Sequence, residues 1–150
     1  MIQKYIIDGN NLIGKISELW QLQESDRQLS RVKLVKKIDE YFGDKKVKVS
    51  IHFDGFESDK IPSTSASLTY SNKKSADSKI KSEIDSSTKP RTIAVISSDH
   101  SVQNYAKVNG CKIIKSEDFG KQMKSKRKRI DEDAIAKSIS NEEIKKMFGL

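Results

Sequence analysis

The stretch Tyr5-Ile6-Ile7-Asp8-Gly9-Asn10-Asn11 joins a short apolar run to a strong turn and cap signal. Apolar side chains then recur at helical spacing over residues 11–23, which predicts a helix directly after the strand. The same pairing returns at residues 92–96 (Thr-Ile-Ala-Val-Ile), the clearest buried strand of the chain, which precedes a predicted helix over 100–108. Strands that alternate with helices are typical of βαβ units. The expected fold class is therefore α/β, with a mostly parallel sheet and helices on both faces.

The remaining segments extend this alternation. Aromatic residues on the apolar stripes, including Trp20 and Phe53, are predicted to be core. Residues 57–67 are polar and are predicted to be a loop. The further elements that we expect are a helix from Ser25 or Asp26 to Gly43, strands over 47–53, 66–70 and 111–114, a helix near 76–86 capped by Ser75, and a helix that begins after Ser116.

The composition narrows the class of partner. The chain has 150 residues, with 29 Lys and Arg against 21 Asp and Glu, so its formal net charge is +8. This surplus favours a polyanion, most often a nucleic acid, and nothing indicates a membrane. The single cysteine, Cys111, cannot form an internal disulfide, and no zinc-type spacing is present. Apolar runs are far shorter than a spanning helix requires. We therefore expect a cytoplasmic protein.

Aspartates end three of the predicted strands: Asp8, Asp54 and Asp99. The carboxyl ends of parallel strands share one edge of the sheet, so these side chains should converge there. Asp77, in the first turn of the helix near 76–86, is expected to reach the same edge. Clustered carboxylates repel one another, and the usual remedy is a hard divalent cation such as Mg²⁺ or Mn²⁺. Such a site predicts metal-assisted hydrolysis of a phosphodiester. The alternative reading is that each aspartate is a helix cap or a turn residue.

Four short motifs occur one after another along the chain. They are residues 7–13 (Ile-Asp-Gly-Asn-Asn-Leu-Ile), 49–55 (Val-Ser-Ile-His-Phe-Asp-Gly), 75–80 (Ser-Ala-Asp-Ser-Lys-Ile) and 95–102 (Val-Ile-Ser-Ser-Asp-His-Ser-Val). This series resembles the NYN domain, a branch of the PIN-like nucleases, and within it the YacP-like bacterial proteins. Residues 140–148 also resemble the C-terminal helix of that branch, although the tryptophan often found there is replaced. The resemblance covers nearly the whole chain.

The resemblance implies a Rossmann-like PIN/NYN fold with a central five-stranded sheet and the first strand in its middle. It implies an endoribonuclease that depends on Mg²⁺ or Mn²⁺, with Asp8, Asp77 and Asp99 as metal ligands and catalytic residues. Asp54 lies where related proteins often carry another catalytic acid. YacP-like proteins include ribosome-associated enzymes that cut mRNA, so RNA, in particular mRNA, and the ribosome are the implied partners.

The resemblance also suggests residues that bind the substrate. Asn10 and Asn11 match a polar pair after the first strand, which would orient a carboxylate or the scissile phosphate. Ser97 and Ser98 match the small hydroxyl residues before the last acid. A departure from the family is that two lysines, Lys79 and Lys81, are close to Asp77, where they would compete with a metal or bind phosphate.

A basic segment, Lys121–Arg129, holds six basic residues and no acidic one. Two of them, Lys124 and Arg127, are candidates to hold an RNA backbone, and each phosphate contact would add salt-dependent affinity. The alternative is a solvated basic helix or a flexible segment. We expect residues 1–120 to form the nuclease domain and residues 121–150 to be a basic segment and C-terminal helix of the same domain.

Two further alternatives stay open. One is a non-catalytic RNA- or ribosome-binding module with the same fold, which would tolerate the loss of Asp8. The other is a metal-dependent phosphatase, against which stands the missing Asp-x-Asp pair, since Gly9 and Asn10 follow Asp8. The sequence leaves the oligomeric state open. Phe56, Tyr70 and Tyr105 are aromatic residues suited to stacking on bases, but nothing in the sequence singles one out.

Overall fold

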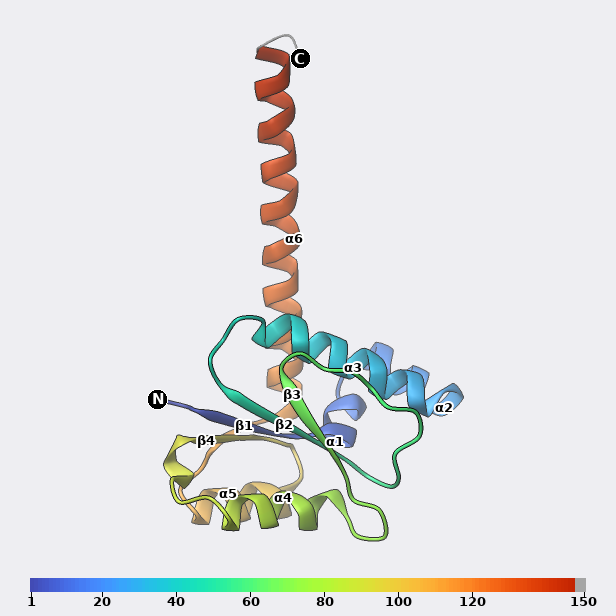
Figure 1. Cartoon of the computed structure of the whole chain (residues 1–150), viewed down its shortest axis with the longest axis vertical. Helices are drawn as coiled ribbons and strands as arrows, with labels where there is room; N and C mark the ends of the chain where they lie inside the picture. Colours follow the sequence, from blue (N-terminus) through green and yellow to red (C-terminus); the bar gives the residue numbers. More distant parts are fainter. Residues whose placement is uncertain (148–150) are drawn as a thin grey trace.

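The sheet is five-stranded and parallel throughout, with the order β3-β2-β1-β4-β5. In the computed structural model, residues 1–147 are described, and side chains are described for residues 1–138. The first strand is central, as the resemblance implies, and the predicted α/β class is confirmed (Figure 1). The strands are β1 (Lys4–Asp8), β2 (Lys48–Phe53), β3 (Ala66–Tyr70), β4 (Ile93–Ile96) and β5 (Lys112–Ile114).

Helices cover both faces of this sheet. One face carries α1, α2, α3 and the beginning of α6, and the other carries α4 and α5 (Figure 1). None of the helices within residues 1–147 combines the length and the apolar character that crossing a membrane requires. The helices are α1 (Gly9–Gly14), α2 (Ser17–Ser25), α3 (Arg27–Phe42), α4 (Ala76–Asp85), α5 (His100–Val108) and α6 (Ser116–Met147), with a short 3₁₀ turn over Pro90–Thr92.

Two apolar cores result from the alternation of side chains along the strands. Ile7 points into the larger core, with Phe42 and Phe119 from α3 and α6, whereas its neighbour Ile6 points into the smaller core, with Ile80 of α4. Successive side chains of a strand face opposite sides of a sheet, so a strand covered on both faces needs apolar residues at every position. This explains the unbroken run Ile93–Ile96, in which all four residues are buried.

The helix expected over residues 11–23 is in fact two helices. After Gly14 the chain turns, and Ile16 adopts an extended conformation (φ −112°, ψ 109°) before α2 begins. The new direction places Leu19 in the core and leaves Trp20 52% exposed. The prediction that Trp20 is a core residue is therefore wrong. Neighbouring helical positions lie about 100° apart, so only one of the two faces the sheet.

The basic segment Lys121–Arg129 lies within α6, which is continuous from Ser116 to Met147. Phe119 and Met123 bury the first turns of α6, and the later turns project away from the sheet (Figure 1). Residues 140–147, which resemble the C-terminal helix of the family branch, are the last turns of α6, and Phe148 lies outside the described residues. The division that we expected at residue 120 falls inside this helix.

Gly9 allows α1 to begin close to β2. A Cβ atom added at Gly9 would lie 2.8 Å from the carbonyl oxygen of His52 and 2.8 Å from the ring of Phe53. Such contacts are shorter than packed atoms tolerate, so a side chain here would push the two elements apart. The motif therefore needs glycine at this position in order to hold Asn10 and Asn11 at the edge of the sheet.

Candidate functional site

Three aspartates lie at the carboxyl edge of the sheet, at the ends of neighbouring strands. Asp8 is the last residue of β1, Asp54 follows β2 directly, and Asp99 lies between β4 and α5. Since β1 lies between β2 and β4, the three positions adjoin one another, although Asp8 and Asp99 are far apart in the sequence. In parallel α/β sheets, this edge is the usual place for a ligand.

Asp8 is the most buried of these acids, with 7% of its surface exposed. Its Oδ2 accepts a hydrogen bond from the hydroxyl of Ser97 at 2.8 Å. Burial and, to a smaller extent, the nearby charges of Asp54 and Asp99 raise the pKa of Asp8, the Ser97 hydrogen bond opposes them, and the net result is a pKa of about 6. The site therefore concentrates negative charge around a carboxylate that is poorly solvated.

Asp54 and Asp99 also accept hydrogen bonds from backbone N–H groups at the start of helices. Asp54 Oδ1 accepts a hydrogen bond from the backbone N–H of Ala76 at 2.9 Å, at the start of α4. Asp99 Oδ1 accepts one from the N–H of Val102 at 3.1 Å and caps α5. The capping alternative is thus realised for Asp99, whereas α4 has its own N-cap, Ser75, and Asp54 binds only the N–H of the first residue of that helix. Since each bond uses one oxygen of the carboxylate, capping does not preclude a second role.

Asp77 lies in the first turn of α4, as expected, but its carboxylate is engaged. Its Oδ1 pairs with the ammonium group of Lys81 at 2.9 Å, one helical turn onward. Lys79 lies between them in sequence and is half-buried. Among the side chains that the structure describes, no three His, Cys, Asp or Glu residues are grouped closely enough to hold a metal ion. The carboxylate oxygens of Asp8, Asp54 and Asp99 are nevertheless the donors that a hard divalent cation prefers.

The side chains of Asn10 and Asn11 position the strand ends. Asn10 Oδ1 accepts the backbone N–H of Asp54 at 2.8 Å, so it orients the residue that carries a candidate carboxylate. Asn11 Oδ1 accepts the N–H of Ser98 at 2.8 Å and the hydroxyl of Ser116 at 2.7 Å. The asparagine pair therefore ties α1 to the ends of β2 and β4 and to the start of α6.

Glu117 is an acid at this edge that the sequence reasoning missed. The hydroxyl of Ser98 donates a hydrogen bond to Glu117 Oε2. This bond holds the pKa of Glu117 below its usual range, and the charges of Lys15 and Lys115 lower it further. The available signal was an acidic residue in the first turn after the helix start at Ser116. Its proximity to Ser98 depends on the packing of α6 and cannot be read from local sequence.

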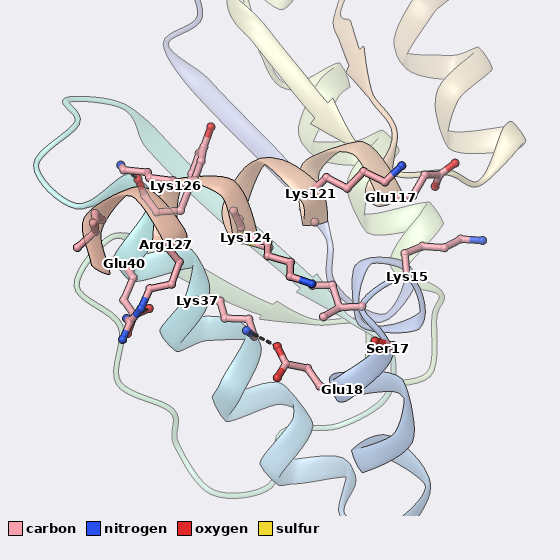
Figure 2. Close-up of a pocket in the computed structure, with 15 residues that line it drawn as sticks. Lys15, Ser17, Glu18, Lys37, Glu40, Glu117, Lys121, Lys124, Lys126 and Arg127 are labelled. Atoms are coloured by element: carbon pink, nitrogen blue, oxygen red, sulfur yellow. Dashed lines mark hydrogen bonds and ion pairs between the residues drawn. The ribbon is translucent and has the colours of Figure 1, made fainter. Parts of the chain in front are cut away.

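A groove of about 740 Å³ opens between the turn after α1 and the helices α2, α3 and α6 (Figure 2). Lys15 and Glu117 lie toward one end, and Glu40, Lys126 and Arg127 lie toward the other (Figure 2). Since Glu117 contacts Ser98, the groove begins beside the aspartate edge. Its lining is basic and apolar, formed by Lys15, Ile16, Ser17, Glu18, Lys37, Glu40, Tyr41, Glu117, Gly120, Lys121, Met123, Lys124, Lys126, Arg127 and Ile130.

Several cations of the groove are already paired. Lys37 pairs with Glu18 at 2.5 Å, and Arg127 pairs with Glu40 at 2.8 Å and with Asp131 at 3.4 Å. Lys124 is exposed and lines the groove. Of the two candidate phosphate ligands in α6, Arg127 would therefore have to leave its carboxylate partners, and Lys124 would not leave any that the structure describes.

A second polar cluster lies between the sheet and α4. Glu83 accepts hydrogen bonds from Ser50 (2.7 Å) and pairs with His52 (2.7 Å) and with Lys4. Burial alone would raise the pKa of Glu83, but these partners outweigh it and lower the pKa to about 2. His52 is 4% exposed, so its contact is an interior one that fastens α4 to β2.

Comparison with known proteins agrees with this architecture. The family model described as the YacP-like NYN domain matches residues 5–148. The crystal structure of Rae1 (YacP) from Bacillus subtilis superposes with a TM-score of 0.73 at 20% identity, over 98% of this chain and 92% of that chain. A tryptophan-to-leucine mutant of the same protein gives a TM-score of 0.74 at 20% identity, over 87% and 79% of the two chains. Comparison with curated protein sequences gave no match.

Proposed function

This chain belongs to the YacP-like NYN domain family, and on that premise we propose that it is an endoribonuclease that depends on Mg²⁺ or Mn²⁺. Its fold is of the RNase type, which its structural neighbours share. The observation that carries the proposal is the position of Asp8, Asp54 and Asp99 at the ends of three adjacent strands. Burial, with a smaller contribution from the charges of Asp54 and Asp99, raises the pKa of Asp8 to about 6. Uncompensated carboxylates at the ligand edge of a parallel sheet are typical of cation sites for phosphodiester chemistry.

We propose Asp8, Asp77 and Asp99 as metal ligands and catalytic residues, with Asp54 as a further acid. A divalent cation would supply stabilisation of the negative charge that develops on the phosphate and on the leaving oxygen. The Ser97 hydroxyl holds Asp8 in place by its bond to Oδ2. Asp77 contributes its carboxylate only after its ion pair with Lys81 opens.

The substrate that we propose is single-stranded RNA, with its backbone held in the groove beside α6. Association with the phosphates is supported by the formal net charge of +8 and by the lysines that line the groove, including Lys15, Lys121 and Lys124. Asn10, Asn11, Ser97 and Ser98 support the aspartate edge, and Lys79 and Arg127 are further candidates for phosphate contacts. A cytoplasmic mRNA as target and the ribosome as partner rest on the family resemblance.

The decisive experiment measures cleavage of single-stranded RNA with Mn²⁺, with Mg²⁺ and with EDTA. Asp8→Asn and Asp99→Asn should each abolish metal-dependent cleavage and leave the folded state intact. Asp44→Asn, at an exposed aspartate in the turn after α3, is the matched control and should cleave as the wild type does. Undiminished cleavage by both site variants would refute the proposal.

A non-catalytic RNA-binding module is the second candidate. Two observations favour it: Asp77 is occupied by Lys81, and no metal-ligating group of three exists among the described side chains. This candidate predicts RNA binding that weakens with salt, needs no divalent metal and survives Asp8→Asn. Binding of this kind without any cleavage by the wild type would select it.

A further inference from the structure

Of the three aromatic candidates for base stacking, Phe56 is exposed and the two tyrosines are partly buried. The hydroxyl of Tyr105 donates to Asp85, and its ring packs against the core beneath α5. Tyr70 is half-buried, and the guanidinium of Arg31 lies 5.2 Å from the centre of its ring. Phe56, in contrast, is 60% exposed. Phe56 lies two residues beyond Asp54, at the carboxyl edge of the sheet.

The backbone that carries Phe56 is held on several sides. Asn10 accepts the N–H of Asp54 at 2.8 Å, and the hydroxyl of Ser71 accepts the N–H of Gly55 at 2.9 Å. The carbonyl oxygen of Gly55 accepts the N–H of Asn72 at 2.8 Å. Gly55 has a φ of +84°, a left-handed conformation that glycine adopts without strain. The loop is therefore fixed by contacts to two other segments of the chain, the start of α1 and the residues after β3.

Arg31 provides the strongest of these restraints. It is 3% exposed, and its guanidinium lies 5.4 Å from the ring centre of Phe53. Its Nη2 donates to the carbonyl oxygen of Asp54 at 2.7 Å, and its Nη1 donates to that of Phe56 at 3.0 Å. Within the described residues, no carboxylate forms a salt bridge with Arg31. A cation buried in this way is costly unless its donors are satisfied, and Nη1 and Nη2 are satisfied by the loop carbonyls, whereas Nε has no hydrogen-bond partner among the described residues. The two bonds therefore fix the position of the loop.

Isolated exposed apolar residues are common on protein surfaces and need no function. Phe56 differs because an apolar ring is held in water on a rigid loop, next to an acid of the proposed site, in a strongly basic chain. We propose that Phe56 is a stacking platform for one nucleobase of the single-stranded RNA bound at the aspartate edge. A ring with a fixed backbone loses little conformational freedom on binding. The inference rests on the proposed function only in taking RNA as the ligand.

The test uses tryptophan fluorescence in EDTA, so that binding is measured without cleavage. Trp20 is the single tryptophan of the chain, and it lies on α2. The double variant Trp20→Phe with Phe56→Trp moves this reporter to the loop. A short single-stranded RNA should quench tryptophan at position 56, and an abasic oligomer of equal length should not. Wild-type protein, which reports from α2, is the control and should show no comparable quenching.

Affinity provides the second measurement. Phe56→Ala should weaken RNA binding roughly five- to hundredfold, the range that base–aromatic stacking supplies, and should leave binding of the abasic oligomer unchanged. Phe56→Tyr should restore RNA affinity, and the melting temperature of Phe56→Ala should match the wild type because the ring is exposed. Unchanged RNA affinity in Phe56→Ala, or equal loss for both oligomers, would overturn the inference. Neither result depends on whether the protein cleaves RNA, so failure of the proposed activity is seen separately.

Discussion

The buried hydroxyl of Ser97 connects the two central aspartates of the site. It donates to Asp8 Oδ2 at 2.8 Å and accepts the backbone N–H of Asp99 at 3.1 Å. Ser97 is fully buried, so this bridge between β1 and β4 is shielded from water. A single side chain thus sets the orientation of Asp8 relative to the start of α5, and charge on Asp8 is stabilised mainly through this contact.

Replacing Asp8 with Asn should stabilise the protein at pH 8, in EDTA, by up to about 3 kcal/mol. The pKa of Asp8 rises from 3.8 to about 6 on folding, so the folded state binds the proton more tightly. Ionisation therefore destabilises the fold as the pH rises from about 4 to about 6, and the cost persists above this range. Asparagine carries no charge and can still accept the Ser97 hydrogen bond. Urea unfolding at pH 8 and pH 4 measures the difference, and an equal gain at both pH values would contradict the argument.

Replacing Lys81 with Gln should increase the affinity for Mn²⁺ several-fold. The substitution removes the cation that pairs with Asp77 at 2.9 Å and so releases a carboxylate at the edge of the site. Isothermal titration calorimetry with Mn²⁺ alone gives the dissociation constant. Lys79→Gln, on the same helix, is the matched control for the loss of one positive charge. If both variants gain affinity equally, the ion pair has no special role.

Replacing Glu83 with Gln should lower the free energy of unfolding at pH 7 by about 2–3 kcal/mol. The partners of Glu83 lower its pKa from 4.5 to about 2, so its contribution is present above pH 4.5 and is lost as the pH falls toward 2. The deficit of the variant should therefore shrink between pH 5 and pH 3. Chemical unfolding across this range tests it. Glu24→Gln, at an exposed acid of α2, should remain near the wild type, and a deficit that does not change with pH would argue against the ionic cluster.

Replacing both Lys121 and Lys124 with Gln should weaken binding of single-stranded RNA and reduce its salt dependence. Each phosphate contact that is lost lowers the slope of log affinity against log salt by about 0.7. Both lysines line the groove beside α6, whereas Lys128 does not. Filter binding over a series of salt concentrations measures the slope. Lys128→Gln is the control, and a slope that changes equally in the control would place the RNA elsewhere on the basic helix.

Much of the fold follows from local sequence. The strand that ends at Asp8 and the buried run Ile93–Ile96 are readable because a strand covered on both faces must be apolar at each position. Ser75 was readable as a helix cap, and its hydroxyl accepts the N–H of Ser78 as expected. The residues that cause these strands and this helix cap lie within a few positions of one another, so the local sequence pattern is enough to predict them.

Other features depend on packing. The break before α2 turns Trp20 into solvent, and the docking of α6 brings Glu117 to Ser98. The pairing of Asp77 with Lys81 had a local signal, since the two residues are one helical turn apart. No local signal showed that the Asp77 carboxylate would pair with Lys81 instead of facing the carboxyl edge of the sheet. The exposure of Trp20 and the position of Glu117 are therefore decided by contacts between different elements.

The sequence by itself determined the α/β class, the central position of the first strand through the family resemblance, and the aspartates that end neighbouring strands. Tertiary structure alone decided which acids are buried and which are paired. It also decided that the buried Arg31 of α3 binds the loop that carries the exposed ring of Phe56. The physical reason is the separation along the chain over which each kind of interaction acts. Hydrophobic periodicity and helix caps act between neighbours in the chain, whereas burial, charge coupling and exposure depend on residues that only folding brings together.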